Sequence, residues 1–382
     1  MKSQPNPPVV SYRAPSATAK RRALPLAAVL LAAAAVLPGA APAAQAASSM
    51  HANDAWQLQS AIVPKTLSLK INGIAMSVPG AESRDGKTTY IALRFLSEKL
   101  ELSVSWDQQR QASTVTGRNV TIVTKATDPQ PYTINGQRSF GIEPVVQNGV
   151  TYVPLRFFLE TFGYAVDYNR KTERITVTPL PINALTIAAK TLDESNGTQD
   201  FVVQYPQITG FADESVQNKV NRTIQTKVNA IAAEARQELK AAEFEQAHIK
   251  KGYTVNYLVA NNSNGKLSLY LESYLYTGGA HGRPARVPLT FDLSTGDTLT
   301  LQQAVGGHPN YKAIVNKIVK EGFAKGNYVL GPNYETEPFE SISDDQPYFL
   351  RNHAAVVYFV PYQYTPYVAG FPEFSIPLSQ FK

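Results

Sequence analysis

The chain has 382 residues, with 36 lysines and arginines, 30 aspartates and glutamates, and no cysteine. Without cysteine it can form neither a disulfide nor a catalytic thiolate. Five of the basic residues fall within the first 22 positions, and the remaining 31 nearly balance the 30 acids, so the basic excess expected of a nucleic-acid-binding protein is missing.

The first 46 residues have the pattern of an export signal. Three consecutive basic residues, 20–22, precede an apolar run over residues 23–37, and small residues around position 46 offer a cleavage site. The apolar run is shorter than the roughly 20 residues that span a bilayer, although retention as an uncleaved anchor stays open. The sequence therefore predicts a signal peptide over residues 1–46. It also predicts a secreted or cell-surface, cell-wall-associated protein with no membrane span after cleavage.

After a polar linker at residues 47–64, the chain contains a duplication. The segment TYIALRFLSEKLELSVSWD, which starts at Thr89, returns 62 residues later as TYVPLRFFLETFGYAVDYN, which starts at Thr151. Each copy is predicted to form a strand, a loop, a strand leading into a helix, and two further strands. Units this small are not expected to bury their apolar faces alone, so the copies should pack together as a small α/β stalk. The predicted stalk domain covers residues 65–180, with copies at about 66–124 and 130–179.

The second copy carries the clearest local signals. Pro154 is placed to open a helix that runs through Phe162, and Gly163 is placed to end it. Apolar residues then alternate over 164–168 and 175–177, which predicts two strands joined by a short turn.

Beyond Pro181 the pattern changes, and residues 181–382 are predicted to form an α+β domain. An apolar stripe over residues 216–239 predicts a helix of about 30 residues. Apolar residues that alternate with polar ones predict a hairpin and a further strand. After them, the sequence predicts a second amphipathic helix and, from a continuous apolar run, a central strand. We therefore expect a mainly antiparallel sheet that carries two helices. The segments are 253–259 and 267–275 for the hairpin, 287–293 for a further strand, 311–323 for the second helix and 354–360 for a central strand.

The duplicated region resembles the stalk module of exported Firmicute proteins, often called the copper amine oxidase N-terminal-like domain. The resemblance rests on residues 152–157 (YVPLRF), Gly163 and residues 166–168 of the second copy, whereas Ala92 and Glu101 depart from it in the first. It implies an exported protein of a Gram-positive bacterium. It does not imply copper, because residues 66–179 contain no histidine to supply imidazole ligands. No cofactor is expected.

The second half resembles the extracellular domain pair of lysozyme-sensing anti-sigma factors and of the front part of some peptidoglycan deacetylases. The resemblance rests on residues 276–282 (YTGGAHG), 291–296 (FDLSTG) and 358–370, although Gln363 stands where that family usually has Glu. It implies a module that faces the cell wall or lysozyme, here expected without its signalling or catalytic partner.

Three features of this half are candidates for contact with a ligand or partner. A glycine-rich loop allows close backbone approach beside a histidine, unless it is only a tight connection between strands. Tyrosines on a proline-punctuated loop suit an interface. An acidic segment, residues 335–345, could steer a cationic partner, bind calcium, or simply be a solvated loop. The candidate residues are Gly278, Gly279, His281, Gly282, Tyr362, Tyr364, Tyr367, Asp344 and Asp345.

The sequence contains no recognisable catalytic constellation. The five histidines include no pair two or four residues apart, so no metal site is predicted. The prediction is a non-catalytic binding protein that presents its C-terminal domain to peptidoglycan or to a cationic, lysozyme-like protein, with no role in binding nucleic acid. The alternative is a cell-wall hydrolase or deacetylase-like enzyme that uses His281 and nearby acids.

Overall fold

The computed structural model describes residues 62–382, apart from residues 101, 126–131, 140–142, 243–249, 326–337 and 352. The predicted signal peptide and residues 47–61 of the predicted linker lie outside the described residues. Within the described part, no helix is both long enough and apolar enough to cross a membrane.

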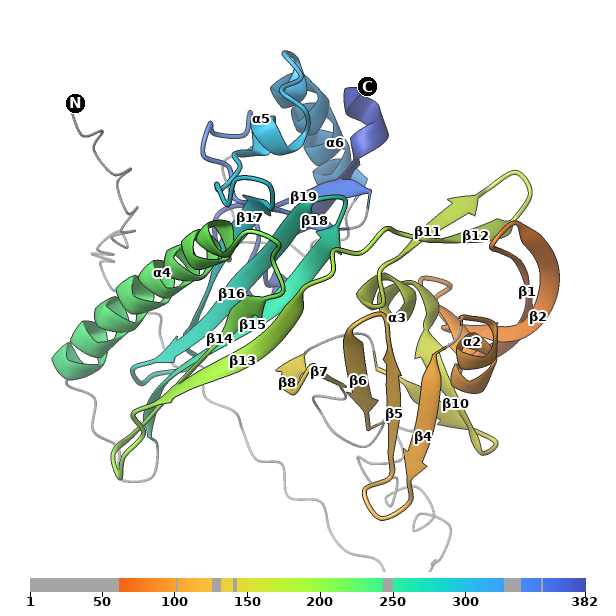
Figure 1. The fold of residues 1–382 in the computed structure, drawn as a ribbon, viewed down its shortest axis with the longest axis horizontal. Helices are drawn as coiled ribbons and strands as arrows, with labels where there is room; N and C mark the ends of the chain where they lie inside the picture. Colours follow the sequence, from red (N-terminus) through yellow and green to blue (C-terminus); the bar gives the residue numbers. More distant parts are fainter. Residues whose placement is uncertain are drawn as a thin grey trace, which may run out of the picture. The chain divides into compact units, whose positions relative to one another are not determined.

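The duplicated region forms one module, which we call the stalk module (Figure 1). It contains two short helices, α2 and α3, and twelve strands in the described residues. In chain order the elements are β1 (Val63–Ile71), β2 (Ile74–Glu82), β3 (Thr89–Ala92), α2 (Leu93–Leu100), β4 (Ser103–Asp107), β5 (Ala112–Gly117), β6 (Val120–Thr124), β7 (Tyr132–Ile134), β8 (Gln137–Ser139), β9 (Val145–Gln147), β10 (Val150–Pro154), α3 (Leu155–Thr161), β11 (Tyr164–Asn169) and β12 (Arg174–Pro179).

The two copies of the repeat are interlocked. One sheet has the strand order β11-β12-β1-β2-β3-β10-β9, and the other has the order β4-β5-β6-β7-β8. Each sheet therefore combines strands from both copies. Most of the buried apolar residues of both copies also belong to one cluster, and a smaller second cluster likewise contains residues of both copies. As the sequence predicted, neither copy has a core of its own.

The copies meet at the antiparallel pair of β3 and β10. In this pair Ile91 lies opposite Val153, and the two residues occupy equivalent positions of the repeat. Both side chains are fully buried. Because equivalent residues face each other, the two copies are related here by a local two-fold axis.

The helix of the second copy ends where the sequence predicted. Pro154 is the N-cap of α3 and Phe162 its C-cap, and Gly163 follows with a φ of 73°. Such left-handed backbone is unfavourable for residues with a Cβ atom, which explains a glycine at this position. The strands expected after Gly163 are β11 and β12.

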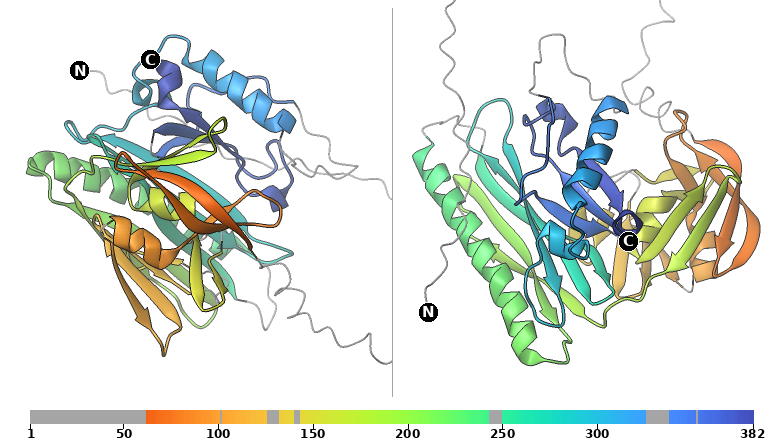
Figure 2. Two further views of the ribbon diagram at one scale, coloured as in Figure 1. Left: turned by 90° about the vertical axis from the view of Figure 1, so that its right-hand side faces the viewer. Right: turned by 90° about the horizontal axis from the view of Figure 1, so that it is seen from above.

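The C-terminal half divides its strands between two sheets, and each sheet has its own buried cluster. The long helix α4 lies along one face of the five-stranded sheet, order β13-β14-β15-β16-β17 (Figure 2). Helix α6 packs with the three-stranded sheet, order β18-β19-β20. The elements are β13 (Thr186–Asp193), β14 (Gln199–Thr209), α4 (Glu214–Ala241), β15 (Lys251–Ser263), β16 (Lys266–Tyr276), β17 (Arg283–Asp292), α5 (Leu301–Ala304), α6 (Tyr311–Lys325), β18 (Tyr348–Arg351), β19 (Ala354–Tyr358), η1 (Tyr367–Ala369), β20 (Glu373–Pro377) and η2 (Leu378–Phe381).

The α+β class with mainly antiparallel sheets is confirmed. The apolar run at 354–360 supplies β19, the central strand of the smaller sheet. The sequence predicted one sheet for this half, and the structure has two because the residues after β17 turn away into α5 and α6. Valines of α6 then cover β18–β20 rather than the larger sheet.

A mostly buried arginine joins the two C-terminal sheets. Arg286 on β17 donates to Glu272 on β16 at 2.5 Å and to Glu373 on β20 at 2.7 Å. Its guanidinium also lies over the ring of Phe371, 4.3 Å from the ring centroid. Arg351 on β18 donates to the other oxygen of Glu373 at 2.9 Å. Two arginines and two glutamates thus neutralise one another where the sheets meet, as buried charges require.

The interlocked core predicts unequal effects for two identical substitutions. Ile91→Ala deletes fully buried atoms at the centre of the β3–β10 pair and should lower the free energy of unfolding by about 2–5 kcal/mol. Ile74→Ala changes a side chain that is 66% exposed and should stay within about 0.5 kcal/mol of the unmodified protein. Urea unfolding followed by circular dichroism measures both. Equal effects would contradict a core centred on this pair.

Candidate functional site

The glycine loop predicted as a contact feature connects β16 to β17. Gly278 and Gly279 have φ values of 115° and 96°, which only glycine adopts readily. Gly282 is required for a different reason, because a Cβ atom there would lie 2.5 Å from the Tyr274 ring and 2.7 Å from the Leu275 carbonyl oxygen. The Gly282 N–H donates to the Tyr274 hydroxyl at 2.7 Å. The backbone of the loop therefore packs directly against an aromatic ring.

The second loop connects β19 to β20 and begins with a tight turn. The Gln363 N–H donates to the Val360 carbonyl, with Pro361 and Tyr362 in the two central positions. Tyr362 has a φ of 71°. Proline followed by a residue with positive φ is the pattern of a type II turn, in which the second central position favours glycine or asparagine. A bulky tyrosine in this conformation is uncommon.

The two loops meet at His281, although more than 80 positions separate them in the sequence. The ring of His281 stacks on the ring of Tyr367, with centroids 3.9 Å apart and planes 21° apart. Its Nε2 atom lies 3.1 Å from the Tyr362 hydroxyl, and its Nδ1 atom lies 2.9 Å from the Gly282 carbonyl oxygen. Tyr367 donates its own hydroxyl to the same carbonyl at 3.0 Å. We call His281, Tyr362, Tyr367 and Tyr274 the aromatic platform.

These contacts define the tautomer of His281. A carbonyl oxygen can only accept, so Nδ1 carries the proton and donates to Gly282. In the neutral ring Nε2 is then an acceptor, and the Tyr362 hydroxyl donates to it. Both ring nitrogens are thus occupied by groups of the two loops. No carboxylate hydrogen-bonds to His281 among the described residues, so the arrangement does not supply the acid that would orient a catalytic histidine.

The environment of Tyr367 keeps its phenol neutral. Burial raises the pKa of Tyr367, and the neighbouring phenols of Tyr274 and Tyr362 raise it further. Tyr367 therefore remains a hydrogen-bond donor through the neutral range. Much of the platform nevertheless faces solvent, since His281, Tyr274 and Tyr362 are exposed.

Seven of the nine candidate residues lie in these two loops, and four of them contact one another where the loops meet: His281, Gly282, Tyr362 and Tyr367. Tyr364 lies apart, because its ring packs against Phe339 and Phe359 beside the smaller sheet. Asp344 forms an ion pair with Lys312 at 2.5 Å, and Asp345 is exposed. Neither aspartate contacts His281. The acidic residues 335 and 337 lie outside the described residues.

Sequence reasoning missed Tyr274. This residue lies on β16, where its hydroxyl accepts from Gly282 and its ring fills the space that a side chain at position 282 would need. A signal was present, since the positions of β16 that alternate with its leucines carry tyrosine at 270, 274 and 276. A tyrosine near the end of a strand that leads into a glycine loop is a candidate packing partner for that loop.

Metal binding finds no support in the described residues, among which no group of three or more histidines, aspartates or glutamates is placed to hold an ion. The copper ligands associated with the name of the stalk family are also missing from the sequence of that module, which has no histidine.

Comparison with known families divides the chain into three segments. Residues 70–177 match the model of the copper amine oxidase N-terminal domain, residues 193–283 match the model described as deacetylase PdaC, and residues 305–379 match a protein family of unknown function, DUF3298. The predicted resemblances and their order are confirmed. The glycine loop lies at the end of the second segment, and the loop of Tyr362 lies in the third.

Two solved structures of the DUF3298 family match the chain. One, from Bacteroides fragilis, is 15% identical and covers 52% of this chain and 93% of its own, with a TM-score of 0.36. The other, from Pseudomonas aeruginosa, is 22% identical and covers 53% of this chain and 92% of its own, with a TM-score of 0.34. Among curated proteins, none matches the chain.

The packing of the glycine loop predicts a specific effect of a single methyl group. Gly282→Ala would force the Tyr274 ring and the loop apart and should destabilise the protein by about 1–3 kcal/mol. Gly197→Ala is the matched control, because a Cβ atom there meets nothing within 4 Å, and we expect it to be neutral. Thermal unfolding and near-ultraviolet circular dichroism of the tyrosines measure both. A neutral Gly282→Ala variant would show that the loop does not depend on this contact.

Proposed function

We propose that this protein is a cell-wall-associated protein outside the cytoplasm that binds the glycan of peptidoglycan through the aromatic platform, without catalysing a reaction. The stalk module would serve as a spacer that presents the C-terminal half to its ligand. The proposal builds on the geometry of one residue, Tyr362, and on the surface that surrounds it.

The observation that carries the proposal is the backbone conformation of Tyr362. Its φ of 71° costs a residue with a Cβ atom about 1–2 kcal/mol relative to ordinary backbone. Its side chain is 55% exposed, so burial does not repay this cost. Local strain that folding alone does not explain is typical of binding and catalytic sites. We therefore infer that Tyr362 is placed for a ligand.

The chemistry of the platform suits a saccharide. Stacked rings offer apolar faces, whereas hydroxyl and imidazole groups at their rims offer hydrogen bonds. A sugar ring has the complementary character, with C–H groups on its faces and hydroxyls around its edge. Tyrosine also loses little conformational entropy when it is immobilised, which favours it at binding surfaces.

The sequence supports the proposed location. The predicted signal peptide would direct the chain out of the cytoplasm. Residues 193–283 match the model described as deacetylase PdaC, and the sequence of the C-terminal half resembles the front part of some peptidoglycan deacetylases. Both observations favour a ligand found in the cell wall.

A cationic, lysozyme-like protein is the second candidate ligand. The exposed carboxylates of Asp344 and Asp345 favour it, since acidic patches attract basic partners. The ion pair between Asp344 and Lys312 reduces the charge that this surface presents. The glycan is therefore the better-supported choice.

Replacement of Tyr362 by glycine separates binding from stability. Tyr362→Gly should weaken sedimentation of the purified mature protein with cell-wall sacculi by about tenfold or more, because it removes the exposed ring. Its free energy of unfolding should stay within about 1 kcal/mol, since relief of backbone strain offsets the larger entropy of glycine in the unfolded chain. Co-sedimentation and urea unfolding measure the two quantities.

The matched control is Tyr168→Ala, which removes a tyrosine of similar exposure, 50%, from the stalk module. It should bind sacculi as the unmodified protein does. Failure of the unmodified protein to sediment with sacculi would contradict the glycan proposal. Binding to lysozyme in calorimetry under the same conditions would then favour the second candidate.

A further inference from the structure

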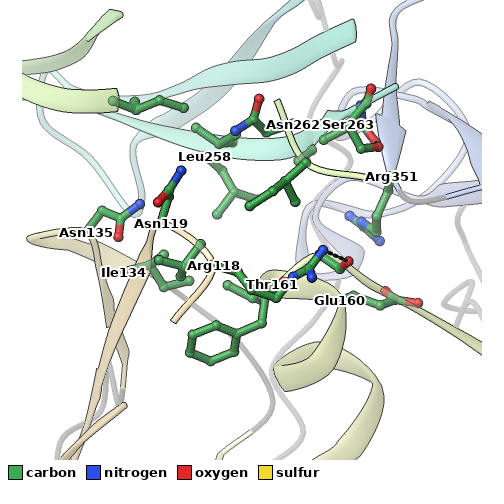
Figure 3. Close-up of a pocket in the computed structure, with 18 of the residues that line it drawn as sticks. Arg118, Asn119, Ile134, Asn135, Glu160, Thr161, Leu258, Asn262, Ser263 and Arg351 are labelled. Atoms are coloured by element: carbon green, nitrogen blue, oxygen red, sulfur yellow. Dashed lines mark hydrogen bonds between the residues drawn. The ribbon is translucent and has the colours of Figure 1, made fainter. Parts of the chain in front are cut away.

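A cavity lies away from the aromatic platform, lined by residues of the stalk module and of both C-terminal sheets. Its volume is about 450 Å³, within the usual range for pockets that bind small ligands. Figure 3 shows Arg118, Asn119 and Asn135 of the stalk module on one side and Leu258 and Asn262 of β15 on the other. No part of the proposed glycan binding uses this cavity.

Two neighbouring strands of the larger sheet separate beside Tyr257, one of the residues that line the cavity. Strands β14 and β15 pair in parallel only as far as Val203 and Val255. Beyond that point the Tyr257 N–H donates at 3.1 Å to the side-chain oxygen of Gln137 on β8, and the amide nitrogen of Gln137 donates to Gln204 at 3.2 Å. Gln137 is only 2% exposed. One amide of the stalk module thus satisfies groups at the point where the strands part.

Arg118 gives the cavity its charge. Its Nε donates to the Phe162 carbonyl at 2.8 Å, and its Nη2 donates to the Gly163 carbonyl at 3.1 Å and to the Leu180 carbonyl. The first of these bonds caps the carbonyl of Phe162, the C-cap residue of α3, and the other two reach carbonyls beyond the helix. No carboxylate pairs with Arg118 among the described residues, and its Nη1 donates to none of them. The other arginines that line the cavity, Arg156, Arg286 and Arg351, all pair with glutamates.

The backbone at Arg118 is also unusual. Arg118 and Asn119 form the two-residue turn between β5 and β6, and both have positive φ, 48° and 62°. This combination defines a type I′ turn, for which asparagine and glycine are the favoured residues. Arginine at the first position is therefore not explained by the turn. Beside it, the Asn119 side chain makes no hydrogen bond to any described residue.

Together these groups suit a ligand that carries one negative charge and several neutral polar groups. The Nη1 group of Arg118 keeps its two N–H donors, and a guanidinium donor binds a carboxylate through charge-assisted hydrogen bonds. The carboxamides of Asn119 and Asn135 add neutral polar groups, and Ile134 and Leu258 add apolar wall. We propose that this cavity binds a carboxylate-bearing ligand of the size of a sugar acid or a dipeptide, with Arg118 as its anion-binding residue.

The test uses the mature protein and three soluble probes in titration calorimetry. N-acetylmuramate carries a carboxylate on a sugar, N-acetyl-alanyl-alanine carries one on a peptide, and N-acetylglucosamine is the uncharged sugar control. We expect at least one of the two carboxylate probes to bind, and its identity tells a saccharide acid from a peptide ligand. Binding of neither, or equal binding of N-acetylglucosamine, would overturn the proposal.

Because Arg118 also caps α3, the test variant is its neighbour. Asn119→Asp places a negative charge beside the guanidinium and should weaken binding of the carboxylate probe by about tenfold or more. Asn72→Asp is the matched control, since Asn72 has a similar φ of 49° in the turn between β1 and β2 and does not line the cavity. Equal affinities of the two variants would contradict the role of Arg118. Tyr362→Gly should leave this binding unchanged, which keeps the result independent of the aromatic platform.

Discussion

The antiparallel pairing of β3 with β10 determines how the stalk module is built. It places Ile91 against Val153, the same position in two copies of one repeat, and buries both. The terminal hairpin of each copy then joins a sheet that also contains strands of the other copy. Apolar burial and strand hydrogen bonds are thereby shared between the copies. Neither copy is therefore expected to fold stably without the other.

The two candidate sites share a physical feature. At Tyr362 and at Arg118, a turn adopts positive φ and carries a side chain that the turn itself does not favour. Asn72-Gly73 and Asn135-Gly136, in the corresponding hairpins of the two copies, show the residues that this backbone favours. Gln111 and Glu173 are further exceptions, both exposed, so positive φ alone does not mark a site. What distinguishes Tyr362 and Arg118 is the tertiary contact that each side chain makes, with His281 and with the Phe162 carbonyl.

Much of the local structure could be predicted from the sequence, because helix α3, its end at Gly163 and the stripe of α4 depend on neighbouring residues. The strand order could not be predicted, because the sequence of a repeat is the same whether the strands of each copy pair with each other or with strands of the other copy. The site was predictable in part: the sequence identified both loops but not their contact at His281. The sequence analysis also placed three tyrosines in one group, but the turn separates them. Tyr364 packs against Phe359, whereas Tyr367 stacks on His281. Tertiary packing decided each of these outcomes.

The local two-fold axis of the stalk module has an evolutionary consequence. In repeat arrays whose units stack end to end, recombination can add or remove one unit and leave the others intact. Here the gain or loss of a single copy would break both sheets at once, since each contains strands of both copies. A change of length by a single unit would therefore require both sheets of this module to be rebuilt, whereas addition of a whole second pair would leave them intact.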